Sequence, residues 1–160
     1  MKSPLLRFAA LFFLFLLGFS VLSVVTSLQN HLQVAEQGIA AAATWLANLG
    51  GSAAKVVDGN YISAAGMTLN INHECTGVFV LFVLASFIGA YPAPLTTKLL
   101  GIGIGLIGLT MVNVIRIATL VRVVEFYPQA FTYFHEYIWQ GAFLMLVTLY
   151  AITWVEWSRP

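Results

Sequence analysis

The stretch CTGVFVLFVLASFIGAYPAPLTT, residues 75–97, contains no charged residue. A transmembrane helix needs about 20 largely apolar residues to cross a hydrocarbon core of about 30 Å. Because Pro92 and Pro94 cannot continue a helix, we expect this helix to end near Tyr91. The stretch therefore predicts a short membrane-spanning helix that is followed by a turn.

Three more stretches are equally apolar and free of charge: Phe8–Val25, Leu99–Ile115 and Tyr137–Val155. The whole chain is 60% hydrophobic and 8% charged, whereas soluble domains carry about 25% charged residues. Its net charge of +1 indicates neither a nucleic-acid surface nor a polybasic membrane tether. We predict an all-α integral membrane protein with one domain over residues 1–160. Its transmembrane helices, about four in number, are expected at residues 6–27, 75–91, 98–118 and 137–157.

The first apolar stretch resembles a signal peptide in having Lys2 and Arg7 in front of it. Its apolar core is longer than the usual 7–15 residues, and no cleavage site follows promptly, which favours an uncleaved anchor. Basic residues mark the cytoplasmic side, and after Arg7 the next one is Lys55. We therefore expect both termini in the cytoplasm, and residues 28–74 and 118–136 on the outer face of the bacterial cytoplasmic (inner) membrane.

The outer segment 28–74 is predicted to form a helix and a β-hairpin. Apolar residues recur at helical spacing, which predicts an amphipathic interfacial helix ending at Gly50-Gly51; they are Leu32, Ala35, Ile39, Ala43 and Leu46. The stretch KVVDGNYI, residues 55–62, predicts a hairpin around Asp58-Gly59. The alternating stretch MTLNIN, residues 67–72, predicts a half-buried strand that leads directly to Cys75.

Three polar residues that are far apart in the sequence are expected at one depth, near the outer ends of helices. Cys75 begins the second helix, Arg116 ends the third, and His135 stands just before the fourth. If Asn72 caps the second helix, Cys75 is its third residue, where free N–H groups and the helix dipole would stabilise a thiolate. Asn113 lies on the same helical face as Arg116. This arrangement predicts an active site.

Each of these residues also has a simpler explanation. A lone cysteine in an apolar protein is usually a small buried hydrophobic residue, and an arginine near a helix end commonly extends to the lipid headgroups. An interfacial histidine is usually structural, and His31 and His73 fit that description better than His135. Because His135 comes from a separate element that can face the thiol, it is the better general acid–base candidate.

Three ordered motifs resemble the exosortase/archaeosortase family of membrane transpeptidases. They are Cys75-Thr76-Gly77 at a helix start, Asn113 to Ile117 as Asn-x-x-Arg-Ile, and His135 with Gly141 six residues later. Together with the approach from Gly59, they cover residues 59–141. Many members have Ser after the cysteine and about eight helices, whereas this chain has Thr76 and about four. Its size and its Glu-Cys-Thr-Gly form are similar to the exosortase H type.

The resemblance implies a cysteine protease or transpeptidase that cleaves the C-terminal sorting signal of exported proteins. Such a signal consists of a short motif, a transmembrane helix and a basic tail. Cys75 would attack the peptide carbonyl, Arg116 would stabilise the oxyanion, His135 would transfer the proton and Asn113 would shape the pocket. The expected partners are these exported proteins and membrane lipid, with no nucleic acid, no metal and no organic cofactor.

Two other functions remain open at this level. A non-enzymatic four-helix subunit that anchors haem or quinone would use His73 and His135 as axial ligands. A purely structural assembly factor would use none of these side chains chemically. Neither alternative provides a shared role for Cys75, Asn113 and Arg116.

Overall fold

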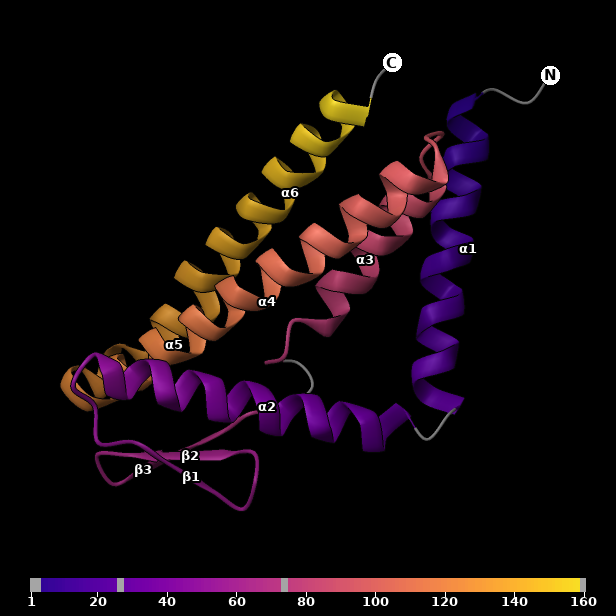
Figure 1. Ribbon diagram of the computed structural model, residues 1–160. Helices are drawn as coiled ribbons and strands as arrows, with labels where there is room; N and C mark the ends of the chain where they lie inside the picture. Colours follow the sequence, from indigo (N-terminus) through magenta and orange to yellow (C-terminus); the bar gives the residue numbers. More distant parts are fainter. Residues whose placement is uncertain (1–3, 26–27, 73–74, 159–160) are drawn as a thin grey trace.

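The computed structural model describes residues 4–25, 28–72 and 75–158 (Figure 1). Lys2, His73 and Glu74, which are named above, lie outside these residues. The long helices are α1 (Pro4–Val25), α2 (Leu28–Leu49), α3 (Val78–Ala90), α4 (Leu95–Phe126) and α6 (Trp139–Ser158). As Figure 1 shows, α1 begins and α6 ends at one end of the molecule, and α2 crosses the opposite end beside a small sheet.

The predicted helices at 6–27, 75–91 and 137–157 agree with α1, α3 and α6 to within about three residues at each end. The prediction for the third helix was wrong at its end, because α4 continues to Phe126 instead of stopping near residue 118. The predicted end of this helix lay close to the end of the charge-free stretch Leu99–Ile115. The helix continues because Ile117 and Val121, one turn apart, are buried against α2 and the sheet.

The segment 118–136, which we expected on the outer face between the third and fourth helices, is itself nearly all helical. After Tyr127 the chain forms a 3-10 turn, η1 (Pro128–Ala130), a single α-turn, α5 (Phe131–Tyr133), and a π-helical turn, η2 (Phe134–Ile138), which leads into α6. Proline favours the first turn of a helix because its φ is already helical and its missing N–H would be unbonded there. Pro128 thus restarts the helix directly after the break.

Helix α2 and the three strands confirm the predicted organisation of the outer segment. Helix α2 ends at Leu49, before Gly51, whose φ is +86°. The strands β1 (Lys55–Val57), β2 (Tyr61–Ala64) and β3 (Met67–Asn70) form an antiparallel sheet in the order β1-β2-β3. The sequence predicted one hairpin at Asp58-Gly59, and a second one at Ala65-Gly66 pairs β3 with β2.

The sheet packs on α2 and on the second half of α4. Alanines on α2 allow a close approach, and together with residues from the sheet and α4 they form a buried cluster: Ala40, Ala43, Ala47, Ala54, Ile62, Ala64, Ile71, Ile117, Ala118 and Val121. Ser52 donates a hydrogen bond to Glu125, which also pairs with Arg122 at 2.8 Å. These contacts fix the sheet to the end of α4.

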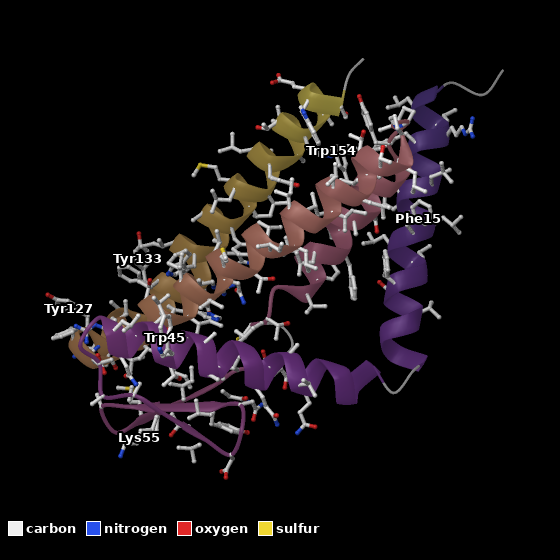
Figure 2. The ribbon with its side chains drawn as sticks, viewed as in Figure 1. Phe15, Trp45, Lys55, Tyr127, Tyr133 and Trp154 are labelled. Atoms are coloured by element: carbon white, nitrogen blue, oxygen red, sulfur yellow. The ribbon has the colours of Figure 1, made fainter. Side chains whose placement is uncertain are left out.

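The other half of the molecule is held together by aromatic and glycine contacts between helices. Phe19 of α1 stacks on Phe82 of α3, with ring centroids 4.9 Å apart. Helix α4 approaches α6 closely at Gly101, where an added Cβ would lie 2.1 Å from Nε1 of Trp154. Figure 2 shows Trp154 reaching from α6 toward α4. Small residues are typical of such close packing between membrane helices.

Among the described residues, two helical segments are long and apolar enough to cross a membrane: Leu95–Phe126 and Pro128–Ser158. Two shorter apolar helices, Leu5–Val21 and Val78–Ala90, accompany them. The large side chains on α4 that face away from the protein are apolar, including Leu99, Ile107 and Met111. Exposed aromatic residues lie near the sheet end, among them Trp45, Tyr127 and Tyr133 (Figure 2), which is typical of a membrane interface.

Candidate active site

Cys75 lies in a turn that connects the sheet to α3. Its backbone N–H is 2.9 Å from the carbonyl oxygen of Asn72 and 3.2 Å from the Oδ1 of the same residue. Helix α3 begins only at Val78, with Gly77 as its N-cap. The prediction that Cys75 is the third residue of the helix was therefore wrong, because Asn72 caps the turn and not the helix.

Gly77 allows this turn to pack closely. Its φ of +71° lies in the left-handed region, which favours glycine because a Cβ would be strained there. An added Cβ would also meet the side chains of Asn113 and Phe143 at 3.6 Å. The third residue of the Cys-Thr-Gly motif thus supports the conformation that presents the cysteine.

Asn113 holds the cysteine turn from α4. Its Nδ2 donates a 2.8 Å hydrogen bond to the carbonyl oxygen of Cys75, and its side chain is only 1% exposed. It does not line the cavity beside the thiol, so its contact is with the backbone of Cys75. The sequence predicts that Asn113 shapes the pocket, and the hydrogen bond to Cys75 is the contact through which it would do so.

Arg116 follows Asn113 by almost one helical turn and lines the cavity beside Cys75. Its Nε is buried and has no hydrogen-bond partner among the described residues. Among the described residues, the only ion pair joins Arg122 and Glu125, and no carboxylate of those residues neutralises Arg116. A buried donor without a partner favours a ligand that supplies an acceptor oxygen.

His135 belongs to η2, inside the last helical segment rather than before it. Its ring stacks on Phe131 one turn earlier, with centroids 5.6 Å apart and planes inclined by 18°. Short π-helical turns are frequent at functional sites. The stacking restricts the imidazole to one side of the helix, where it lines the same cavity as Arg116.

A cavity of about 340 Å³ joins the three residues. Cys75, Arg116 and His135 come from the turn before α3, from α4 and from η2, and all three line this cavity. One wall is apolar and consists of Ile117, Leu120 and Phe131. The cavity thus combines a thiol, a cation and an imidazole beside an apolar wall.

Two parts of this cavity were not predicted from the sequence as parts of a site. One is the run Thr68–Asn72 from β3 onward, which lines the cavity without a break. The other is Phe131, which lies in the segment 118–136. The alternating pattern of residues 67–72 predicted a strand, but it did not predict which elements would lie beside the two edges of that strand. In the described residues no three His, Cys, Asp or Glu side chains form a group able to hold a metal ion.

Comparison with known proteins identifies the family. The model of the family described as Transmembrane exosortase (Exosortase_EpsH) matches residues 3–154. The chain belongs to the transmembrane exosortase family. It is accordingly a membrane protein, and membership of this family supports a sorting-transpeptidase role. It does not favour a haem or quinone anchor.

A curated relative of this exosortase is the probable archaeosortase E of Methanocaldococcus jannaschii. It is 29% identical over 105 residues, which cover 66% of this chain and 56% of the relative. The exosortase therefore spans little more than half of that protein's length. No solved structure matches the chain.

Proposed function

We propose that this exosortase is a cysteine-dependent protease or transpeptidase that cleaves the C-terminal sorting signal of exported proteins. The observation that carries the proposal is the single cavity shared by Cys75, Arg116 and His135. These side chains come from three separate elements. A nucleophile, an oxyanion-stabilising cation and a general acid–base are the groups that acyl transfer requires.

In the first step, the Cys75 sulfur attacks the carbonyl carbon of the scissile peptide bond while His135 accepts the thiol proton. The carbonyl oxygen becomes an oxyanion, and the guanidinium of Arg116 supplies the donor that it needs. The C–N bond then breaks, and His135 returns the proton to the leaving amine. The products are a thioester on Cys75 and the released C-terminal fragment.

In the second step, an acceptor nucleophile attacks the thioester, and His135 removes its proton. An amine or hydroxyl of a cell-envelope acceptor gives transpeptidation, whereas water gives hydrolysis. The thiol of Cys75 leaves and recovers a proton. Asn113 contributes by fixing the Cys75 carbonyl, since a small displacement of a nucleophile lowers the rate strongly.

We further propose that the cavity faces the exterior, with both termini in the cytoplasm. In support, α1 begins and α6 ends at the end of the molecule opposite to the sheet (Figure 1). A substrate whose C-terminal helix shares the bilayer would present its motif at the outer surface. Confinement of both proteins to one membrane raises their effective concentration.

The test is co-expression of the exosortase with a tagged exported protein from the same genome that ends in a motif, a transmembrane helix and a basic tail. Cys75→Ala and Arg116→Ala should leave this substrate full-length in the membrane. Arg122→Ala is the matched control, because Arg122 is on the same helix but pairs with Glu125. The Arg122→Ala variant should cleave the tagged substrate at the native rate.

Hydroxylamine provides a direct check of the thioester. It should release the cleaved substrate as a hydroxamate from the native exosortase and not from Cys75→Ala. Normal processing by Cys75→Ala would exclude the thiol as nucleophile. An equal loss of substrate cleavage in Arg116→Ala and Arg122→Ala would show that Arg116 has no specific role in the reaction.

A further inference from the structure

The register of the sheet determines which backbone groups of β3 remain available. The N–H of Ile71 donates a 2.9 Å hydrogen bond to Asn60, and Leu69 lies opposite Ile62. In an antiparallel ladder, alternate residues bond to the neighbouring strand. Residues 67, 69 and 71 therefore face β2, and the N–H and C=O groups of Thr68 and Asn70 point to the other edge.

This other edge is open and borders the active-site cavity. Strand β3 is the last strand in the order β1-β2-β3, and Thr68 and Asn70 are exposed. The Cys75 thiol lies 3.9 Å from the carbonyl oxygen of Asn70. That contact confirms independently that the outward side of Asn70 faces the nucleophile.

We propose that the substrate binds as an added strand on this edge of β3, which places its scissile carbonyl beside Cys75. The inference rests on the proposed function and names how that function selects its substrate. Edge strands bind extended peptides through main-chain hydrogen bonds, while pockets select alternate side chains. Here Thr68 offers an N–H and a C=O, and Asn70 offers an N–H.

The apolar wall supplies the side-chain selection. Ile117, Leu120 and Phe131 border the same cavity as the edge, and side chains alternate between the two faces of a strand. An extended substrate therefore directs every second side chain toward this wall and the others away from it. The expected substrate is an extended segment with an apolar residue near the scissile bond.

Proline substitutions test the pairing because proline removes a backbone N–H. Thr68→Pro and Asn70→Pro remove outward N–H groups and leave the bonds between β3 and β2 in place, as edge strands permit. Each lost hydrogen bond should lower the rate of substrate cleavage about two- to tenfold.

The opposite edge of the sheet provides a matched control. Because the backbone of Ile62 bonds to β3, the backbone of its β1 partner Val56 is not bonded to β2 and points outward from β1. Val56 does not line the cavity. Val56→Pro should therefore impose the same strain on an edge strand without reducing cleavage.

The readouts are cleavage of the co-expressed substrate and labelling of Cys75 by iodoacetamide, a small reagent that needs no strand pairing. Retained labelling with reduced cleavage in Thr68→Pro and Asn70→Pro supports the proposal. Cleavage at the native rate in both variants overturns it. If Asn70→Pro also loses labelling, Thr68→Pro, which is further from the thiol, decides by the same criterion.

These outcomes separate the inference from the proposed function. If Cys75→Ala abolishes cleavage and neither proline variant reduces it, the strand pairing fails and the thiol mechanism stands. If Cys75→Ala cleaves normally, the mechanism itself fails.

Discussion

Replacing Asn113 with alanine should release Cys75 from the helix that holds the rest of the active site. The amide makes one hydrogen bond, from Nδ2 to the Cys75 carbonyl at 2.8 Å, and its buried Oδ1 has no partner within the described residues. Alanine thus removes the hydrogen bond that ties the Cys75 backbone to α4. The net contribution of one such hydrogen bond is about 0.5–1.5 kcal/mol.

If this energy is lost from the transition state, the rate of substrate cleavage falls about two- to twelvefold. The assay follows disappearance of the full-length tagged substrate over time, with exosortase levels matched by immunoblot. Iodoacetamide labelling of Cys75 should persist in Asn113→Ala, because the thiol remains present but is no longer held in position. The combination of retained labelling and slow cleavage is the expected signature.

Asn48→Ala is the control for this experiment. Asn48 also bonds to the backbone through its amide, donating to and accepting from Ala54 at 3.0 Å in each case. It lies on α2 and does not line the cavity, so its loss should affect stability without slowing cleavage. Cleavage by Asn113→Ala within twofold of the native rate would refute the positioning role.

Two further substitutions test the packing around the site. Gly101→Ala should destabilise the protein by about 1–3 kcal/mol, because the new Cβ would lie 2.1 Å from the ring of Trp154; a lower Tm in detergent would show it. Gly103→Ala, with nothing within 4 Å, should keep or raise the Tm, and equal Tm values for the two variants would contradict this packing. Phe131→Ala removes the ring that stacks on His135 and should slow cleavage about two- to tenfold, whereas Phe131→Tyr, which keeps the ring, should cleave faster than Phe131→Ala. Identical rates for both would mean that the stacking does not position the imidazole.

Local patterns were sufficient to predict the kinds of elements that this exosortase contains. Four charge-free runs predicted apolar helices. The Asp58-Gly59 pair predicted a turn, and the positive φ angles of these residues in the structure, +49° and +85°, confirm it. The motif resemblance was confirmed by the family match. All of these signals depend on neighbouring residues, which is why they are readable in a single sequence.

The ends of the helices and the contacts between elements could not be predicted as well, because contacts between residues far apart in the sequence determine them. Helix α4 extends to Phe126 because its last turns are buried on α2 and the sheet, and hydropathy registers no such burial. Cys75 precedes α3 because Asn72 bonds within the turn. In each case a tertiary or turn contact overrode the boundary that composition indicated.

The sequence by itself determined that this is an apolar helical chain in which Cys75, Arg116 and His135 come from three separate segments, although Arg116 lies well inside α4 and not near its end as predicted. Only the tertiary structure decided that these three line one cavity, that Asn113 holds the cysteine backbone, and that the free edge of β3 borders the thiol. The physical reason is that hydropathy and turn propensity are set by adjacent residues. Sheet register, helix packing and cavity walls depend on which distant surfaces meet.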